Sequence, residues 1–188
     1  FDTDVLLAIL AQAPGLVVID EAYTPFAQIS KMDWLHDYPN LIILRTLSKL
    51  GFAGLRLGFA VGHPAWIQEM NKLRLPYNIN ALTQMSASMA LQNFSLFERQ
   101  IARIRQDRAA LSQQLAAMEG VTVWPSHANF ILFRVDNASA NEIHAMLRER
   151  GILIKNLHGA HPQLANCLRV TVGTPEENRA FLDGISHG

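Results

Sequence analysis

The chain has 188 residues, 16 basic and 16 acidic side chains, and a formal net charge of zero. This balance gives no electrostatic reason to expect a nucleic-acid or membrane-surface partner. Hydrophobic residues make up 49% of the chain, which is enough for a packed core. The sequence shows no signal peptide and no apolar run long enough to span a bilayer. The single cysteine, Cys167, cannot form an internal disulfide, so we expect a cytoplasmic protein.

The first half of the chain alternates helical and strand patterns, which is typical of an α/β fold. The predicted elements, in chain order, are a helix at 3–13, a strand at 16–20, a short helical candidate at 31–36, strands at 41–45 and 57–61, and helices at 64–73 and 81–92. Pro64 is suited to the first turn of its helix. This order predicts a sheet with helices around it.

From residue 95 onward the pattern predicts a second, smaller α+β region. Its expected elements are a long amphipathic helix at 95–119, strands at 121–124 and 129–135, a helix at 139–150, strands at 152–155 and 167–172, and a last helix from residue 175. We therefore expect two domains, residues 1–94 and 95–188.

Two helix starts in this second region carry capping signals. Ser139 is followed three residues later by Glu142, which is the pattern of a capping box. Thr174 precedes Pro175, which predicts Thr174 as the N-cap and Pro175 as the first helical residue.

The loop after the predicted strand 41–45 contains one lysine among hydroxyl groups and glycines, in Thr46-Leu-Ser-Lys49 and Gly54-Leu-Arg56-Leu-Gly58. A partly desolvated lysine amine is a usable nucleophile toward an aldehyde. Thr46, Ser48 and Arg56 are suited to hold a phosphate, the arginine through a charge-assisted fork. A lysine beside a phosphate site suggests pyridoxal 5′-phosphate. Taken alone, such a loop is more often a solvated turn.

The strand at 16–20 ends in Asp20-Glu-Ala-Tyr23. A carboxylate at the carboxyl end of a strand lies where α/β sheets bind ligands. A buried Asp20 needs a cationic partner, and a protonated pyridine nitrogen is such a partner. Tyr23 is placed to donate a hydrogen bond to the phenolic oxygen of the same ring. The alternatives are that Asp20 caps a helix and that Tyr23 is a packed loop aromatic.

Together, these three motifs resemble the cofactor half of the fold-type-I, pyridoxal-phosphate-dependent aminotransferases. The segment 166–178 is similar to the closing segment of the histidinol-phosphate aminotransferase family. The match runs through essentially the whole chain, in the order that the family shows. The resemblance implies that residues 1–94 are the C-terminal part of the large cofactor-binding domain, with a mixed sheet. Residues 95–188 would be a linking helix and the small α+β domain.

The resemblance implies a role for each matching residue. Lys49 would bind the cofactor covalently and then act as general base and acid in the proton shift. Asp20 would pair with the pyridine nitrogen, and Tyr23 would bond the ring oxygen. The expected phosphate ligands are Thr46, Ser48 and Arg56.

Two cations of the second region are implied to bind substrate. Arg169 would clamp the α-carboxylate of the amino-acid substrate, because its planar fork matches a carboxylate. Lys155 stands where many members of the family have arginine, and it would meet a substrate phosphate as a point charge. The alternative interpretation of both residues is an ordinary solvated charge on a strand. Asn129, His158 and His161 lie in matching or neighbouring segments and receive no role.

The activity implied by the resemblance is transamination between L-histidinol phosphate and 2-oxoglutarate, in a homodimer. Members of the family are about twice as long as this chain, so the chain is expected to be an incomplete enzyme. The alternatives are an aromatic aminotransferase, a phosphothreonine decarboxylase, or a cofactor-binding sensor domain of a transcription regulator. None of the seven histidines has metal-ligand spacing.

Overall fold

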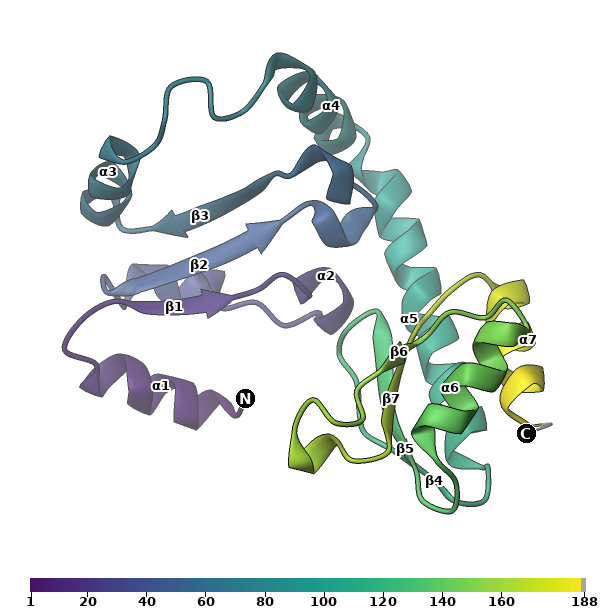
Figure 1. Ribbon diagram of the computed structural model, residues 1–188. Coiled ribbons are helices and arrows are strands. Elements are labelled where there is room, and N and C mark those ends of the chain that lie inside the picture. Colours follow the sequence, from purple (N-terminus) through teal and green to yellow (C-terminus); the bar gives the residue numbers. More distant parts are fainter. Residues whose placement is uncertain (187–188) are drawn as a thin grey trace. The chain divides into compact units, whose positions relative to one another are not determined.

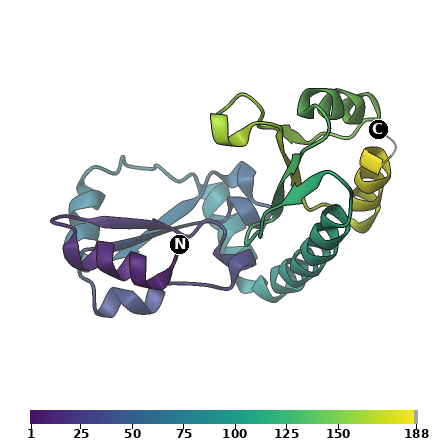
Figure 2. The same cartoon turned by 90° about the horizontal axis from the view of Figure 1, so that it is seen from below.

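The computed structural model describes residues 1–186 and contains two compact units, residues 1–98 and the chain from residue 99 onward. Figures 1 and 2 show the two units from two directions. Each unit has its own sheet and its own hydrophobic core. Within the described part of the chain, no helix combines the length and the hydrophobicity needed to cross a membrane.

The first unit is built on a three-stranded sheet of order β1-β2-β3 (Figure 1). β1 (Val17–Asp20) and β2 (Leu41–Thr46) are parallel, and β3 (Gly58–Gly62) is antiparallel to β2. The helices of this unit are α1 (Thr3–Gln12), α2 (Thr24–Ala27), α3 (Pro64–Lys72), α4 (Ala81–Gln92) and the start of α5 (Phe94–Ala116). Short 3-10 turns lie at Met32–His36, Ser48–Leu50 and Ala53–Leu55. The predicted elements are therefore confirmed to within a few residues, and α2 is an addition.

One face of this sheet forms the core of the first unit. Leu10 of α1 packs against Leu41 and Ile43 of β2, and all three are buried. Side chains alternate between the faces of a strand, so Val18 and Leu44 lie on the opposite face. There they are 52% and 37% exposed. The sheet is thus packed on one face and partly open on the other.

The second unit contains a four-stranded antiparallel sheet of order β4-β5-β7-β6. Its elements are β4 (Val121–Val123), β5 (Phe130–Val135), α6 (Ala140–Glu149), β6 (Lys155–Asn156), β7 (Cys167–Thr171) and α7 (Pro175–Ser186), together with most of α5. Alternate residues of β5 and β7, including Phe133 and Leu168, are buried against α5, α6 and α7. The other residues of the two central strands, Arg169 among them, face the opposite side.

The strand predicted at 152–155 is wrong for three of its four residues. Gly151 adopts a left-handed conformation (φ 77°), and the Ile152 N–H donates to the Leu147 carbonyl at 2.8 Å. This hydrogen bond closes the C-terminal end of α6, so the residues after Gly151 do not start a strand. Ile152 and Ile154 pack against the core instead. Only the end of the predicted strand, Lys155, pairs with β7.

The two capping predictions have different outcomes. The Thr174 hydroxyl accepts the Glu177 N–H at 3.3 Å, and the Thr174 N–H donates to the Glu177 carboxylate at 2.7 Å, so Thr174 is the N-cap of α7. Ser139 precedes α6 as predicted, but its side chain makes no capping hydrogen bond. Instead, the Asn166 side chain accepts the first helical N–H, that of Ala140, at 3.4 Å.

Candidate active site

The predicted cofactor residues gather at one edge of the three-stranded sheet. Asp20 ends β1 and Thr46 ends β2, and the two strands are parallel, so the loops that follow them leave from the same edge. Tyr23 lies in the loop after β1. Lys49 and Arg56 lie in the loop between β2 and β3. The topology therefore brings residues from two distant motifs to one place.

Lys49 and Tyr23 lie close together at this edge. The Lys49 Nζ atom lies 5.2 Å from the centroid of the Tyr23 ring. Lys49 belongs to the 3-10 turn Ser48–Leu50, which ends at Gly51 in a left-handed conformation (φ 96°). The lysine side chain is exposed, so the expected partial desolvation of its amine is wrong for this chain. The amine is instead accessible to a ligand, with an aromatic ring beside it.

The two hydroxyl groups of the loop form one small cluster. The Thr46 and Ser48 hydroxyls lie 2.9 Å apart, and the Ser48 N–H donates to the Thr46 oxygen at 3.0 Å. The Thr46 hydroxyl also lies 3.2 Å from the carbonyl of Leu57, the residue after Arg56. Arg56 has a left-handed backbone (φ 52°), and its guanidinium is exposed and donates to the Ala53 carbonyl at 3.3 Å. The backbone of the arginine turn thus adjoins the hydroxyl cluster.

Asp20 does not have the expected environment. Its side chain is exposed, and one carboxylate oxygen accepts the Ala22 N–H at 2.9 Å. The alternative of a helix N-cap is also wrong, because the N-cap of α2 is Tyr23. Asp20 closes its own turn and keeps an accessible carboxylate at the sheet edge.

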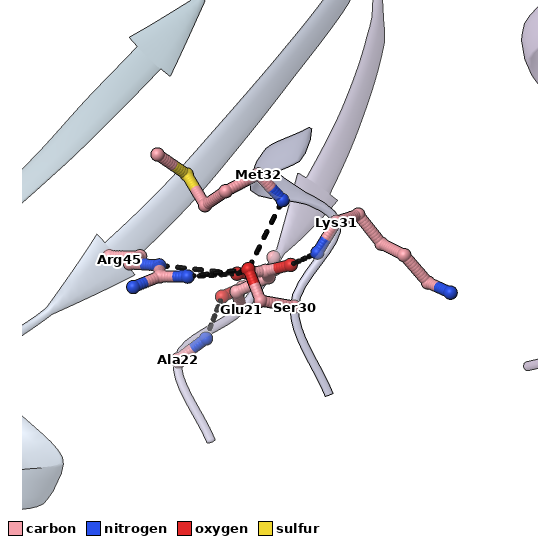
Figure 3. A network of polar contacts seen from close by, with 7 residues as sticks. Glu21, Ala22, Ser30, Lys31, Met32 and Arg45 are labelled. Atoms are coloured by element: carbon pink, nitrogen blue, oxygen red, sulfur yellow. Dashed lines mark hydrogen bonds and ion pairs between the residues drawn. The ribbon is translucent and has the colours of Figure 1, made fainter. Parts of the chain in front are cut away.

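The buried carboxylate of this region belongs to Glu21, which the sequence analysis did not single out. Its Oε2 atom accepts from Arg45 Nη2 at 2.8 Å and from Arg45 Nε at 3.1 Å (Figure 3). The Ser30 hydroxyl lies 3.1 Å from the same oxygen, and the Lys31 N–H donates to Oε1. A signal was present in the sequence: an acid follows the end of one strand, and a base precedes the end of the neighbouring strand.

Arg169 and Lys155 lie side by side in the second unit. They are directly opposite each other in the β6–β7 pairing. Two like charges opposite each other on one face are unfavourable unless an anion lies between them. The Arg169 guanidinium lies 4.8 Å from the Phe130 ring centroid. Its Nε atom is buried and has no hydrogen-bond partner among residues 1–186, so the arrangement is suited to bind an anion.

Among residues 1–186, Cys167 and the histidines form no further catalytic or metal centre. Cys167 is fully buried in β7, and desolvation by burial raises the pKa of its thiol, so the side chain is packing rather than a nucleophile. Over the described residues, no group of three or more His, Cys, Asp or Glu side chains is placed to hold a metal ion.

Residues 2–185 match the family model described as aminotransferase class I and II. The chain belongs to this family. It is 52% identical to the histidinol-phosphate aminotransferase of Chromobacterium violaceum over 98% of its own length. That alignment covers 51% of the relative, so the chain spans about half the length of the curated relatives it matches. The predicted resemblance is thereby confirmed.

Solved structures show the same fold. The histidinol-phosphate aminotransferase of Clostridium acetobutylicum superposes with a TM-score of 0.91 at 22% identity, over 100% of this chain and 59% of that one. The histidinol-phosphate aminotransferase of Sinorhizobium meliloti, solved in complex with pyridoxal-5′-phosphate, gives a TM-score of 0.84 at 24% identity, over 100% of this chain and 52% of that one. The predicted fold class, fold-type-I aminotransferase, is therefore confirmed. The assignment of residues 1–94 and 95–188 to the large and small domains stays a prediction.

Proposed function

We propose that this chain is part of a pyridoxal-phosphate-dependent aminotransferase that acts on L-histidinol phosphate. The observation that carries the proposal is the placement of the Lys49 amine beside the Tyr23 ring, at the sheet edge where Asp20 and Thr46 end their strands. The family supports pyridoxal 5′-phosphate as the cofactor. The name of the 52% identical relative supports histidinol phosphate as the substrate.

The residues at the sheet edge fit the polar groups of this cofactor. The Lys49 amine is accessible for bond formation with an aldehyde. The Asp20 carboxylate has one local hydrogen bond and capacity for a second, to a protonated ring nitrogen. Tyr23 offers a phenol to the ring oxygen. The phosphate would be held by the clustered hydroxyls of Thr46 and Ser48 and by the guanidinium of Arg56.

Each residue has a distinct part in the reaction. When bound, the cofactor supplies an electron-withdrawing ring that makes the proton on the amine-bearing carbon of the substrate acidic. Lys49 Nζ takes that proton as a general base and holds it for return as a general acid. Asp20 favours the protonated form of the ring nitrogen, and Tyr23 orients the ring beside the lysine.

Arg169 and Lys155 would select the substrates. L-histidinol phosphate presents a phosphate near its amine-bearing carbon, and 2-oxoglutarate, the proposed amino acceptor, presents a carboxylate near its keto carbon. The planar fork of Arg169 matches both anions, and its unpaired Nε atom leaves a donor for them. Lys155, directly opposite in the sheet, adds a point charge that favours the doubly charged phosphate.

We further propose that the protein is a cytoplasmic homodimer. Large apolar side chains between residues 73 and 91 are 58–97% exposed: Leu73, Leu75, Tyr77, Leu82, Met85, Met89 and Leu91. Such a concentration of exposed apolar side chains in one segment favours an interaction surface, and a second copy of the protein is the proposed occupant. Light scattering after size exclusion tests this, and a monomer at micromolar concentration would contradict it.

Borohydride trapping tests the cofactor site. The protein is mixed with pyridoxal 5′-phosphate and reduced, and the adduct is located by peptide mass mapping. We expect one adduct, on Lys49, which is lost in Lys49→Ala. Lys72, on the exposed side of α3, is the matched control, and Lys72→Ala should leave the adduct in place. Labelling spread over several lysines would contradict a formed site.

Turnover assays on the full-length protein test the substrate, because this chain spans about half the length of its relatives. Histidinol phosphate with 2-oxoglutarate should give glutamate, whereas phosphothreonine and phenylalanine should react far more slowly. Release of carbon dioxide from phosphothreonine would indicate the decarboxylase, and preference for phenylalanine the aromatic aminotransferase. An adduct on Lys49 without turnover of any of the three by the full-length protein would favour the sensor domain.

A further inference from the structure

A partly buried ion pair, Glu21–Arg45, lies next in the chain to two of the proposed cofactor ligands. Glu21 follows Asp20 in the chain, and Arg45 precedes Thr46. We infer that Glu21, through Arg45 and Ser30, is a positioning residue that sets the Asp20–Tyr23 turn relative to the lysine loop. This inference rests on the proposed function, because the groups that it positions are the proposed cofactor ligands.

The pair lies on the face of the sheet opposite to Asp20 and Thr46. Alternation along β2 places Arg45 on the same side as Ile43, which packs against Leu10 of α1. Asp20 and Thr46, one residue away in each strand, point to the other side. Glu21 and Arg45 therefore do not face the proposed cofactor site. They act on it through the backbone of Asp20 and Thr46, their neighbours in the chain.

Glu21 joins the ends of both parallel strands. Its N–H donates to the Leu44 carbonyl at 2.9 Å, which continues the pairing of β1 with β2 by one residue. Its carboxylate then holds the Arg45 guanidinium through two donors to one oxygen. A backbone hydrogen bond and an ion pair thus fix the position of Asp20 relative to Thr46.

Glu21 also closes the loop that contains Tyr23. Its second carboxylate oxygen accepts the N–H of Lys31, ten residues further along the chain (Figure 3). The Ser30 hydroxyl lies 2.7 Å from Arg45 Nη2 and 3.1 Å from Glu21 Oε2, so it contacts both members of the ion pair. Tyr23 lies within this closed loop, and its ring lies beside Lys49. One carboxylate therefore fixes the base of the loop that presents the tyrosine.

The burial of Glu21 makes the ion pair sensitive to loss of one partner. The Glu21 side chain is 5% exposed and that of Arg45 is 30% exposed. Removing one member of such a pair leaves the other charge without compensation, and the loss spreads through the hydrogen-bond network. The turn would then relax, and the cofactor ligands would lose their relative placement.

Glu21→Gln, measured in the protein with bound cofactor, tests the inference. The substitution keeps the shape of the side chain and removes its charge. We expect the dissociation constant for pyridoxal 5′-phosphate to rise about tenfold, within the range of coupling between contacting residues. We also expect the pH midpoint of the bound cofactor's absorbance to shift, because Asp20 would no longer be held at the ring nitrogen. Glu69→Gln, the same change in the exposed Glu69–Lys72 pair of α3, should alter neither quantity.

The outcomes separate a positioning role from a purely structural one. A lower melting temperature without a change in cofactor affinity or absorbance midpoint would overturn the inference. If Glu21→Gln does not fold, Ser30→Ala removes only the hydroxyl shared by the pair, and a smaller change in the same direction is expected. No change in either cofactor quantity for Ser30→Ala would then overturn it. Failure of the unaltered protein to form the Lys49 adduct would instead overturn the proposed function.

Discussion

The two polar sites of this chain are held in position by different means. In the first unit, the proposed cofactor ligands lie at the last residues of β1 and β2 and in the turns that follow these strands. In the second unit, Arg169 and Lys155 lie within paired strands, and sheet register alone sets them opposite each other. Residues in turns need additional contacts to fix them, and the Glu21 network supplies such contacts. Residues within a sheet inherit their placement from the backbone ladder.

The apolar clusters of the two units also differ, in the number of buried residues that they contain. Three helices cover one face of the four-stranded sheet, and the resulting cluster contains twelve buried residues. The corresponding cluster of the first unit contains three, Leu10, Leu41 and Ile43, with partly buried neighbours. In the second unit, the strands that carry the proposed anion site therefore lie on a larger apolar cluster than the strands of the first unit.

The largest expected effect comes from opening the core of the second unit. Phe133 is fully buried and packs edge-on against Phe181 at 6.0 Å between ring centroids. Phe133→Ala should lower the free energy of unfolding of this unit by about 3–5 kcal/mol. Urea denaturation, with hydrogen exchange of the β5 and β7 amides, measures the change.

Val18→Ala is the matched test in the first unit. Val18 is 52% exposed on the open face of β1, so its truncation should cost only about 0.5 kcal/mol. A loss as large as that of Phe133→Ala would mean that this face is packed, and the contrast between the units would fail.

The next effect concerns the anion site. In the full-length enzyme, Arg169→Lys keeps the charge and removes the planar fork, so we expect KM for the anionic substrate to rise about tenfold, with a smaller change in kcat. Arg148→Lys, the same exchange on the exposed side of α6, should leave both constants unchanged. Equal effects of the two substitutions would contradict a substrate role for Arg169.

A smaller effect separates the two helix caps. Thr174→Ala removes the hydroxyl that accepts the Glu177 N–H and should lower the free energy of unfolding by about 1 kcal/mol. Ser139→Ala should cost much less, because the Ser139 side chain makes no capping bond. Thermal unfolding of both variants measures the difference. A similar loss for both would mean that the serine caps α6 in solution.

The sequence predicted most of the fold because its elements carry local signals. Hydrophobic alternation, the N-cap at Thr174 and Pro64 at a helix start each act over a few residues. The failures lie where distant residues decide the outcome. The Asn166 side chain, rather than that of Ser139, accepts the first helical N–H of α6. The chain after Gly151 completes a helix end instead of forming a strand.

The candidate site shows the same limit. The sequence motifs located Lys49, Tyr23 and Asp20, and the parallel pairing of β1 with β2 brings their turns together. The motifs did not show that Glu21, rather than Asp20, is the buried carboxylate. That distinction depends on which face of β1 is packed, and on an arginine 24 residues away, which only the register of the sheet reveals.

The smallest expected effect is a pH dependence at the start of α7. Hydrogen bonding of the Glu176 carboxylate to its own backbone N–H, and then to the Thr174 hydroxyl, lowers the pKa of this side chain from its ordinary value of 4.5. Because the pKa is lower in the folded protein, its stabilising contribution is complete above pH 4.5 and is lost as pH falls through the folded value. Glu176→Gln should therefore lower the melting temperature slightly at neutral pH and converge with the unaltered protein in acid. If the melting temperatures of the two proteins instead change in parallel with pH, the Glu176 carboxylate does not stabilise α7. The start of this helix would then depend on backbone geometry alone, as the placement of Arg169 does.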